Sequence, residues 1–231
     1  MTNRLRLMDV GWVLVTNLLL LAGVLAWGWP AGNVFVLFWI ENVILGAATA
    51  VKIATADGVD PASASTTPRW ARTLFFVFHY GIFALVHGVF SVIIAFGIGF
   101  SFSLWALGLP AALIALRYGV ELATGWFLGD ARRTVTPGQA FASPYPRLIV
   151  LHVATILGFF VVMSSTFRTT AGGRAAGPLG PLLNWLDAHG HPVSSGLLVV
   201  SILLVIKTIA DLLVLRSRAK GTPLKFSYGT S

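Results

Sequence analysis

The chain has 231 residues, of which 56% are hydrophobic and only 10% are charged. Because soluble domains carry about 25% charged residues, this composition excludes an ordinary soluble protein and predicts a protein that lies in a membrane. The chain has no cysteine, which excludes disulfides, thiolate metal ligands and a thiol nucleophile. The net charge of +8 is typical of basic loops beside a membrane, so we expect no nucleic acid partner.

Six apolar runs are long enough to cross the roughly 30 Å hydrocarbon core of a bilayer as helices. The first run is too long for the apolar region of a signal peptide, so we interpret it as a retained helix. The sequence therefore predicts an all-α fold, a six-transmembrane-helix bundle that forms a single integral membrane domain over residues 1–231. The predicted spans are residues 10–29, 34–55, 73–96, 104–128, 147–167 and 196–215. Residues 181–189 form a predicted short amphipathic helix on the membrane surface.

The basic residues are divided unequally between the two sides of such a bundle. Of the 16 Lys and Arg residues, only Arg168 and Arg174 fall on the side away from the termini, whereas twelve fall on the side that holds both termini. Cytoplasmic loops carry an excess of Lys and Arg, so we expect both the N- and the C-terminus in the cytoplasm.

The third apolar run carries an unusual number of polar side chains for a membrane segment. Residues three or four apart share one face of a helix, and the residues on that face are Tyr80, Ala84, His87 and Ser91. His79 lies about 100° from Tyr80. We expect the polar face to point into the bundle, because polar groups are costly in hydrocarbon. Small residues repeat every seven positions at Gly81, Gly88 and Ala95, a pattern that favours close helix contact.

Depth along the predicted helices sorts the other polar residues into two groups. An inner polar layer contains His79, Tyr80, Glu121, His152 and Asp211, with Arg117 and Lys207 about one turn deeper. An outer cluster contains Glu41 and His87. Two pairs spaced by four residues, Arg117 with Glu121 and Lys207 with Asp211, can neutralise each other within one helix. Lys52 lies near a helix end, from which its side chain can reach the membrane surface.

Three interpretations of these residues remain open. In the first, His79, His152 and Asp211 bind a divalent metal, zinc or iron, with Glu121 as a further ligand. In the second, Glu41, His87, Tyr80 and His79 relay a proton or an ion across the membrane. In the third, the polar residues only hold the helices together. No fixed ligand spacing such as H-E-x-x-H supports the metal site, and no recognisable nucleophile supports an enzyme, so the sequence assigns no enzymatic activity.

Several motifs resemble those of a family of bacterial multi-pass membrane proteins that is catalogued only as a domain of unknown function. The motifs are F-H-Y-G with a following H-G in the third span, P-Y-P-R with a following L-H in the fifth, and K-T-I-A-D-L in the sixth. The matching residues are Glu41, Lys52, His79, Tyr80, Gly81, His87, Gly88, Pro144, Tyr145, Arg147, His152, Lys207 and Asp211. The resemblance implies a place in the bacterial cytoplasmic membrane and implies no established activity.

We therefore expect a multi-pass protein of the bacterial inner membrane that binds a metal cation at its inner polar layer. A proton-coupled transporter or channel-like relay is the alternative. A non-catalytic subunit or scaffold of a membrane complex is the third choice. The lipid bilayer is the expected partner, and the sequence is also compatible with a homo-oligomer.

Overall fold

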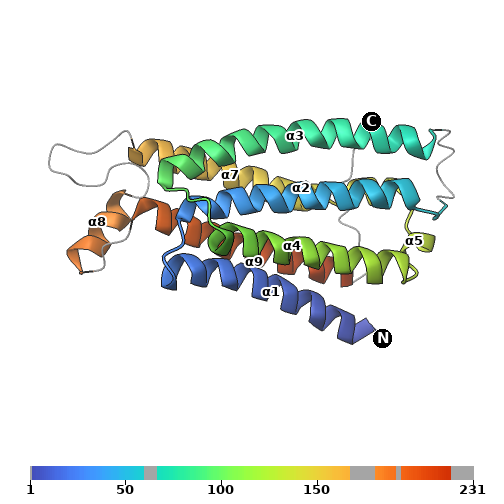
Figure 1. Ribbon diagram of the computed structural model, residues 1–231, viewed down its shortest axis with the longest axis horizontal. Coiled ribbons are helices and arrows are strands. Elements are labelled where there is room, and N and C mark those ends of the chain that lie inside the picture. The colour runs from blue at the N-terminus through green and yellow to red at the C-terminus, as the bar shows by residue number, and fades with distance from the viewer. Residues whose placement is uncertain (1, 60–66, 167–179, 191–193, 220–231) are drawn as a thin grey trace, which may run out of the picture.

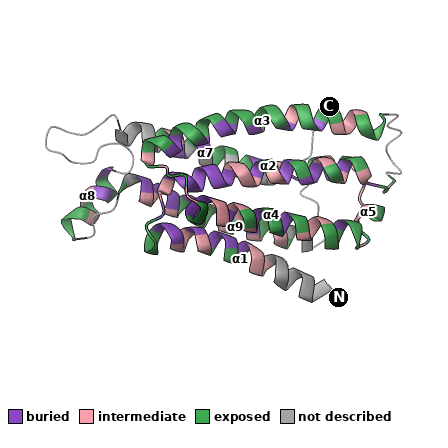
Figure 2. Ribbon diagram, in the orientation of Figure 1, coloured by how far each residue is buried: buried purple, intermediate pink, exposed green. Residues whose placement is uncertain are grey.

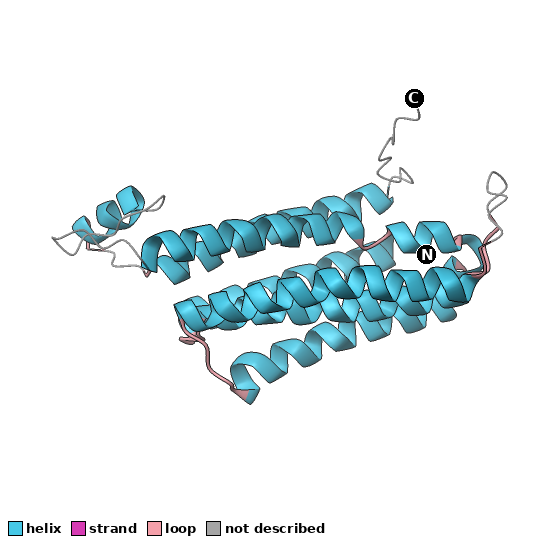
Figure 3. Ribbon diagram, turned by 90° about the horizontal axis from the view of Figure 1, so that it is seen from above, coloured by secondary structure: helices cyan, strands magenta, loops and turns pink. Residues whose placement is uncertain are grey.

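The computed structural model describes every residue of the chain except 1, 60–66, 167–179, 191–193 and 220–231. Every regular element in the described ranges is a helix, as predicted (Figure 3). In chain order the elements are α1 (Thr2–Ala26), α2 (Ala31–Thr55), α3 (Arg69–Ile98), η1 (Leu104–Gly108), α4 (Leu109–Val120), η2 (Glu121–Phe127), α5 (Ala131–Thr134), α6 (Pro137–Ala142), α7 (Tyr145–Thr166), α8 (Gly180–Ala188) and α9 (Ser195–Ala219). The elements η1 and η2 are π-helical turns that continue into α4 at its two ends.

Among the described residues, four helices are long and apolar enough to cross a membrane: Ala31–Thr55, Arg69–Ile98, Leu104–Phe127 and Gly196–Leu213. Residues Val10–Ala26 of α1 form a shorter apolar helix. The all-α fold is thus confirmed. The count of six spans and the cytoplasmic position of the termini stay predictions. The long helices lie side by side, and α1 begins at the same end of the bundle at which α9 ends (Figure 1).

Helix α2 lies at the centre of the bundle and contacts α3, α4, α6, α7 and α9. Its first two turns are almost completely buried, and Phe35 and Leu37 belong to the main hydrophobic core. Helix α3, in contrast, is buried on one side only, and Figure 2 shows its outer side exposed. The outer side carries large apolar side chains such as Phe78, Ile82 and Phe96, which makes it compatible with contact to lipid.

The buried face of α3 is the face that the sequence predicts. Tyr80, Ala84, His87 and Ser91 are all buried, whereas His79 is only partly covered. The predicted stripe of small residues contacts α2 at two of its three positions. A methyl group on Gly88 would lie 2.7 Å from the indole nitrogen of Trp39, and the backbone of Ala95 lies against Gly32. Gly81, the third position, has nothing near it.

The segment between η2 and α7, which lies between two predicted spans, folds into two short helices, α5 and α6. Helix α6 begins with a capping box, in which the Thr136 hydroxyl accepts from the Gln139 amide and the Gln139 side chain accepts from the Thr136 amide. Helix α6 packs against α2 and α3 through Ala140 and Phe141. Helices α5 and α6 fill the space at the end of the bundle, and α7 begins deeper, at the level of His79. The rings of Tyr145, at the start of α7, and His79 lie 6.4 Å apart. His79 is ten residues after the start of α3, so α7 begins roughly 15 Å further along the bundle than α3 does.

Candidate intramembrane polar site

The middle of the bundle contains a lysine that is shared by two carboxylates from different helices. Lys207 of α9 places its Nζ 2.9 Å from Glu41 Oε2 of α2 and 2.8 Å from Asp211 Oδ2 of its own helix. The side chains of Lys207, Glu41 and Asp211 are 14%, 12% and 7% exposed. The pair of Lys207 and Asp211, four residues apart, is the pair that the sequence predicts. The contact to Glu41 joins α9 to α2.

Glu41 is also held by α4. The Arg117 guanidinium lies 3.7 Å from Glu41 Oε1, and the Tyr118 hydroxyl donates to the same oxygen at 3.2 Å. Arg117 is buried. Two cations, Arg117 and Lys207, therefore balance two anions, Glu41 and Asp211. Such a balance is needed here because an unpaired charge inside a bundle of apolar helices costs several kcal/mol. We call these four residues the central ionic cluster.

Helix α1 completes the shell of the cluster with an amide. Asn17 is buried, and its Oδ1 accepts from Lys207 Nζ at 3.2 Å, while its Nδ2 lies 3.5 Å from Asp211 Oδ2. Neither Asn17 nor Tyr118 was predicted from the sequence as part of this site. Asn17 was detectable, because a side-chain amide inside a long apolar run is costly in hydrocarbon. Tyr118 is polar as well, but the sequence does not show how its helix is rotated and therefore not that its hydroxyl faces Glu41.

A second ion pair continues the line of charges along the same two helices. Lys52 of α2 donates to Glu121 Oε1 at 3.0 Å, and both side chains are partly exposed. Glu121 begins the π-helical turn η2, four residues after Arg117. Because Glu41 and Lys52 lie on the same face of α2, the two pairs form a row from the middle of the bundle toward the end where α2 stops.

The predicted outer cluster of Glu41 and His87 does not form. His87 instead meets His152 of α7, with 2.8 Å between His87 Nε2 and His152 Nδ1. The reason lies in the faces of α2. The Trp39 indole donates to the carbonyl of Ala84 at 2.8 Å, so Trp39 faces α3. Glu41 is two residues further, about 200° around the helix, and faces α4 and α9.

For neutral imidazoles, the hydrogen bonds of His87 and His152 assign one tautomer to each ring. His87 Nδ1 lies 2.6 Å from the Phe83 carbonyl oxygen, which can only accept, so His87 Nδ1 carries a hydrogen. His87 Nε2 is then an acceptor, and His152 Nδ1 donates to it. His87 is buried, whereas His152 is exposed on the outer side of α7.

The structure places the four predicted metal ligands in separate surroundings. His79 lies among aromatic rings, with centroid distances of 5.5 Å to Phe75 and 5.2 Å to Phe83. His152 contacts His87, Asp211 contacts Lys207, and Glu121 contacts Lys52. Within the described part of the chain no three His, Cys, Asp or Glu side chains are close enough to hold one metal ion. The metal site stays a prediction that no described contact supports.

Tyr80 and Arg147 are the two remaining residues that the sequence analysis singled out near the polar site. Tyr80 lies against Gly46 of α2 and donates its hydroxyl hydrogen to Asn42, whose own side-chain nitrogen is buried without a partner among the described residues. Arg147 lies in the first turn of α7, and its side chain is outside the described residues.

Comparison with known proteins gives a family and no function. The model of a family of unknown function, DUF6498, matches residues 2–225 of the chain. No curated protein and no solved structure matches the chain.

Proposed function

The chain belongs to this family of unknown function, DUF6498, and we propose that it is a multi-pass protein of the bacterial inner membrane that relays protons through its central ionic cluster. The observation that carries the proposal is the position of Lys207, which is shared by Glu41 of α2 and Asp211 of α9 in the middle of apolar helices. Ionisable side chains at such a depth mark proton or ion pathways by default.

The shared lysine gives the cluster two arrangements. When both carboxylates are charged, Lys207 and Arg117 tie α2 to α9 and to α4 through Glu41. A proton added to Glu41 removes its negative charge, so Lys207 keeps only Asp211 as its ionic partner. The attraction that joins α2 to α9 is then lost, and the helices can separate slightly. Loss of the proton restores the first arrangement. Such a two-state element is what a proton-driven change requires.

The row of ion pairs supplies a path toward one end of the bundle. Lys52 and Glu121 lie between the cluster and the end where α2 stops, and both are partly exposed. A proton from the water on that side meets Glu121 first and the Arg117–Glu41 pair about one turn deeper.

The two histidines supply a further proton carrier. A proton that binds His152 Nε2 makes that imidazole cationic, and its Nδ1 hydrogen can pass to His87 Nε2 along the 2.8 Å contact. His152 is then neutral, and His87 carries the charge beside the Phe83 carbonyl oxygen.

The same contact disfavours a metal held by this pair. Two nitrogens bound to one tetrahedral zinc at 2.0–2.1 Å are roughly 3.3 Å apart. The observed 2.8 Å is the length of a hydrogen bond.

The experiment is a measurement of proton flux in liposomes that contain the purified full chain. A potassium gradient with valinomycin supplies the driving voltage, and a pH-sensitive dye inside the vesicles reports proton entry. We expect wild-type protein to admit protons faster than protein-free liposomes do. Equal rates in both preparations, with the protein shown to be folded and inserted, would contradict the proposal.

A further inference from the structure

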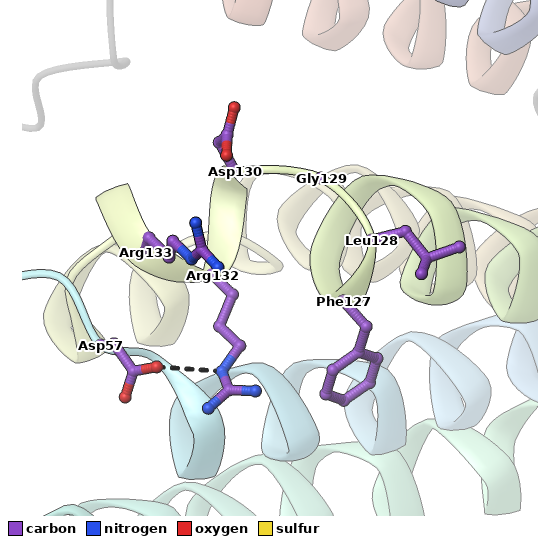
Figure 4. Close-up of a pocket in the computed structure, with 7 residues that line it drawn as sticks. All are labelled: Asp57, Phe127, Leu128, Gly129, Asp130, Arg132 and Arg133. Atoms are coloured by element: carbon purple, nitrogen blue, oxygen red, sulfur yellow. Dashed lines mark hydrogen bonds and ion pairs between the residues drawn. The ribbon is translucent and has the colours of Figure 1, made fainter.

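The end of the bundle where α2 stops carries a polar cavity of about 380 Å³. Its wall comes from three segments, namely Asp57 two residues past the end of α2, the end of η2 with the turn that follows it, and α5 (Figure 4). The lining residues used below are Asp57, Phe127, Leu128, Asp130, Arg132 and Arg133. We call it the Arg132 pocket. It lies outside the central ionic cluster, and the proposed relay does not use it.

In its contacts with the described residues, Arg132 is fixed in this pocket through its Nε alone. Its Nε donates to the Thr55 carbonyl oxygen at 3.1 Å and to Asp57 Oδ2 at 3.0 Å, the contact drawn in Figure 4. Among the residues that the structure describes, none accepts from its two Nη groups. The guanidinium is therefore held in place while most of its donors stay available. Such a fixed fork is suited to bind the oxygens of a phosphate.

Asp57 positions Arg132 and does not cancel the positive charge of the site. Its Oδ1 accepts from Arg69 Nη1 at 2.9 Å, and its Oδ2 accepts from Arg132. The hydrogen bond from Arg69 and the charges of both arginines hold the pKa of Asp57 below its ordinary value, so this carboxylate stays charged at neutral pH. Both of its oxygens are occupied by arginine.

The remaining charges leave a net positive site. Arg133 and Asp130 line the same pocket, and the structure shows no ion pair for either side chain within its described part. Arg69, Arg132 and Arg133 together outnumber Asp57 and Asp130 by one charge. A phosphate diester carries one negative charge, so it neutralises the site.

Apolar side chains at the rim indicate which kind of phosphate fits. Phe127 is 45% exposed and is the last residue of the apolar helix Leu104–Phe127, and Leu128, which follows it, is 84% exposed. On the α3 side of Arg69 an apolar groove of about 560 Å³ is lined by Trp70, Leu74 and Val77. Exposed tryptophan and arginine beside such apolar surface are typical of the boundary between lipid headgroups and hydrocarbon.

We propose that the Arg132 pocket binds the phosphate of a membrane phospholipid, with Arg132 and Arg133 as the donors. Arg132 is preset by Asp57 and Thr55, and Arg133 brings the second positive charge from the next position of α5. The rim of Phe127 and Leu128 contacts the apolar part of the same lipid.

The test is a calorimetric titration, in which short-chain phosphatidylglycerol is added to the detergent-purified full chain and the heat of binding is measured. The variant is Arg133→Gln, because Arg133 makes no described contact that folding needs. The matched control is Arg216→Gln, an exposed arginine on α9 near the same end of the bundle. We expect Arg133→Gln to weaken binding about tenfold and Arg216→Gln to leave it unchanged. The reason is that one hydrogen bond to a charged group changes a dissociation constant about tenfold or more.

Two results would overturn the proposal. One is equal binding by wild type and Arg133→Gln. The other is an equal loss in Arg216→Gln, which would show a general attraction of anions to a basic surface. A competition arm decides the source of the phosphate. Glycerol 3-phosphate that displaces the lipid at equal concentration would overturn the lipid assignment, and failure to displace it would support the assignment.

Discussion

Replacement of Glu41 by glutamine should destabilise the protein far more than the same change at Glu121. Glu41→Gln keeps the shape of the side chain and removes its charge. Lys207 and Arg117 then face Asp211 alone, which leaves one buried positive charge without a partner. Breaking a buried pair in this way costs about 3–5 kcal/mol of unfolding free energy. An amide oxygen still accepts from Tyr118, so we expect a loss of about 3 kcal/mol.

Glu121→Gln is the matched control for this loss. Glu121 also pairs with a lysine, Lys52, but its side chain is 31% exposed. A pair so accessible to solvent contributes about 0–1 kcal/mol. The assay is reversible unfolding in mixed detergent micelles, with circular dichroism as the signal that reports the loss of helix. The double variant Glu41→Gln with Lys207→Met restores the charge balance, so its loss should be about 1–3 kcal/mol smaller than the sum of the single losses. Additive losses, or a loss below about 1 kcal/mol for Glu41→Gln, would show that Glu41 and Lys207 do not form a stabilising buried pair.

Two further predictions concern helix α3. Gly88→Ala should destabilise the protein by about 1–3 kcal/mol, because its methyl group would lie 2.7 Å from the Trp39 indole nitrogen. Gly81→Ala should change the unfolding free energy little, because its methyl group would enter open space. Equal losses of unfolding free energy in the two variants would count against the packing of α2 on α3. Nitrogen NMR of the labelled protein at high pH should show His87 and His152 both with hydrogen on Nδ1; hydrogen on His87 Nε2 would contradict the assigned hydrogen bonds.

The sequence predicts the helices well because their signal is local. An apolar run of about 20 residues needs no knowledge of its neighbours to be recognised as a helix. The same holds for contacts within one helix. The pair of Lys207 and Asp211 and the buried face that contains Tyr80 and His87 follow from the helical repeat alone, and the structure confirms both.

Contacts between helices could not be predicted in the same way, because they depend on how each helix is rotated and where it begins. Depth placed Glu41 near His87, but Glu41 faces α4 and α9 while Trp39 faces α3. Depth likewise placed His152 beside His79. The short helices α5 and α6 shift the start of α7 along the bundle, so His152 meets His87 two turns further along α3.

The role of Lys207 illustrates the difference most clearly. Its spacing from Asp211 was enough to predict one ion pair, and that pair alone reads as local neutralisation. The contact to Glu41 changes this interpretation, because it makes one lysine the link between two helices that are far apart in the sequence. A proton relay depends on that second contact, and only the folded chain reveals it.

The most direct test of the relay is a comparison of proton flux through Glu41→Gln and Glu121→Gln in liposomes of identical composition and protein content. Both variants remove one glutamate charge beside a lysine. Glu41 belongs to the central ionic cluster, whereas Glu121 lies at the partly exposed end of the path, where water can deliver protons in its place. We expect Glu41→Gln to lower the flux at least about tenfold, to the level of protein-free liposomes, and Glu121→Gln to retain at least about a third of it. Wild-type flux in Glu41→Gln, with the variant shown to be folded, would exclude a relay through Glu41.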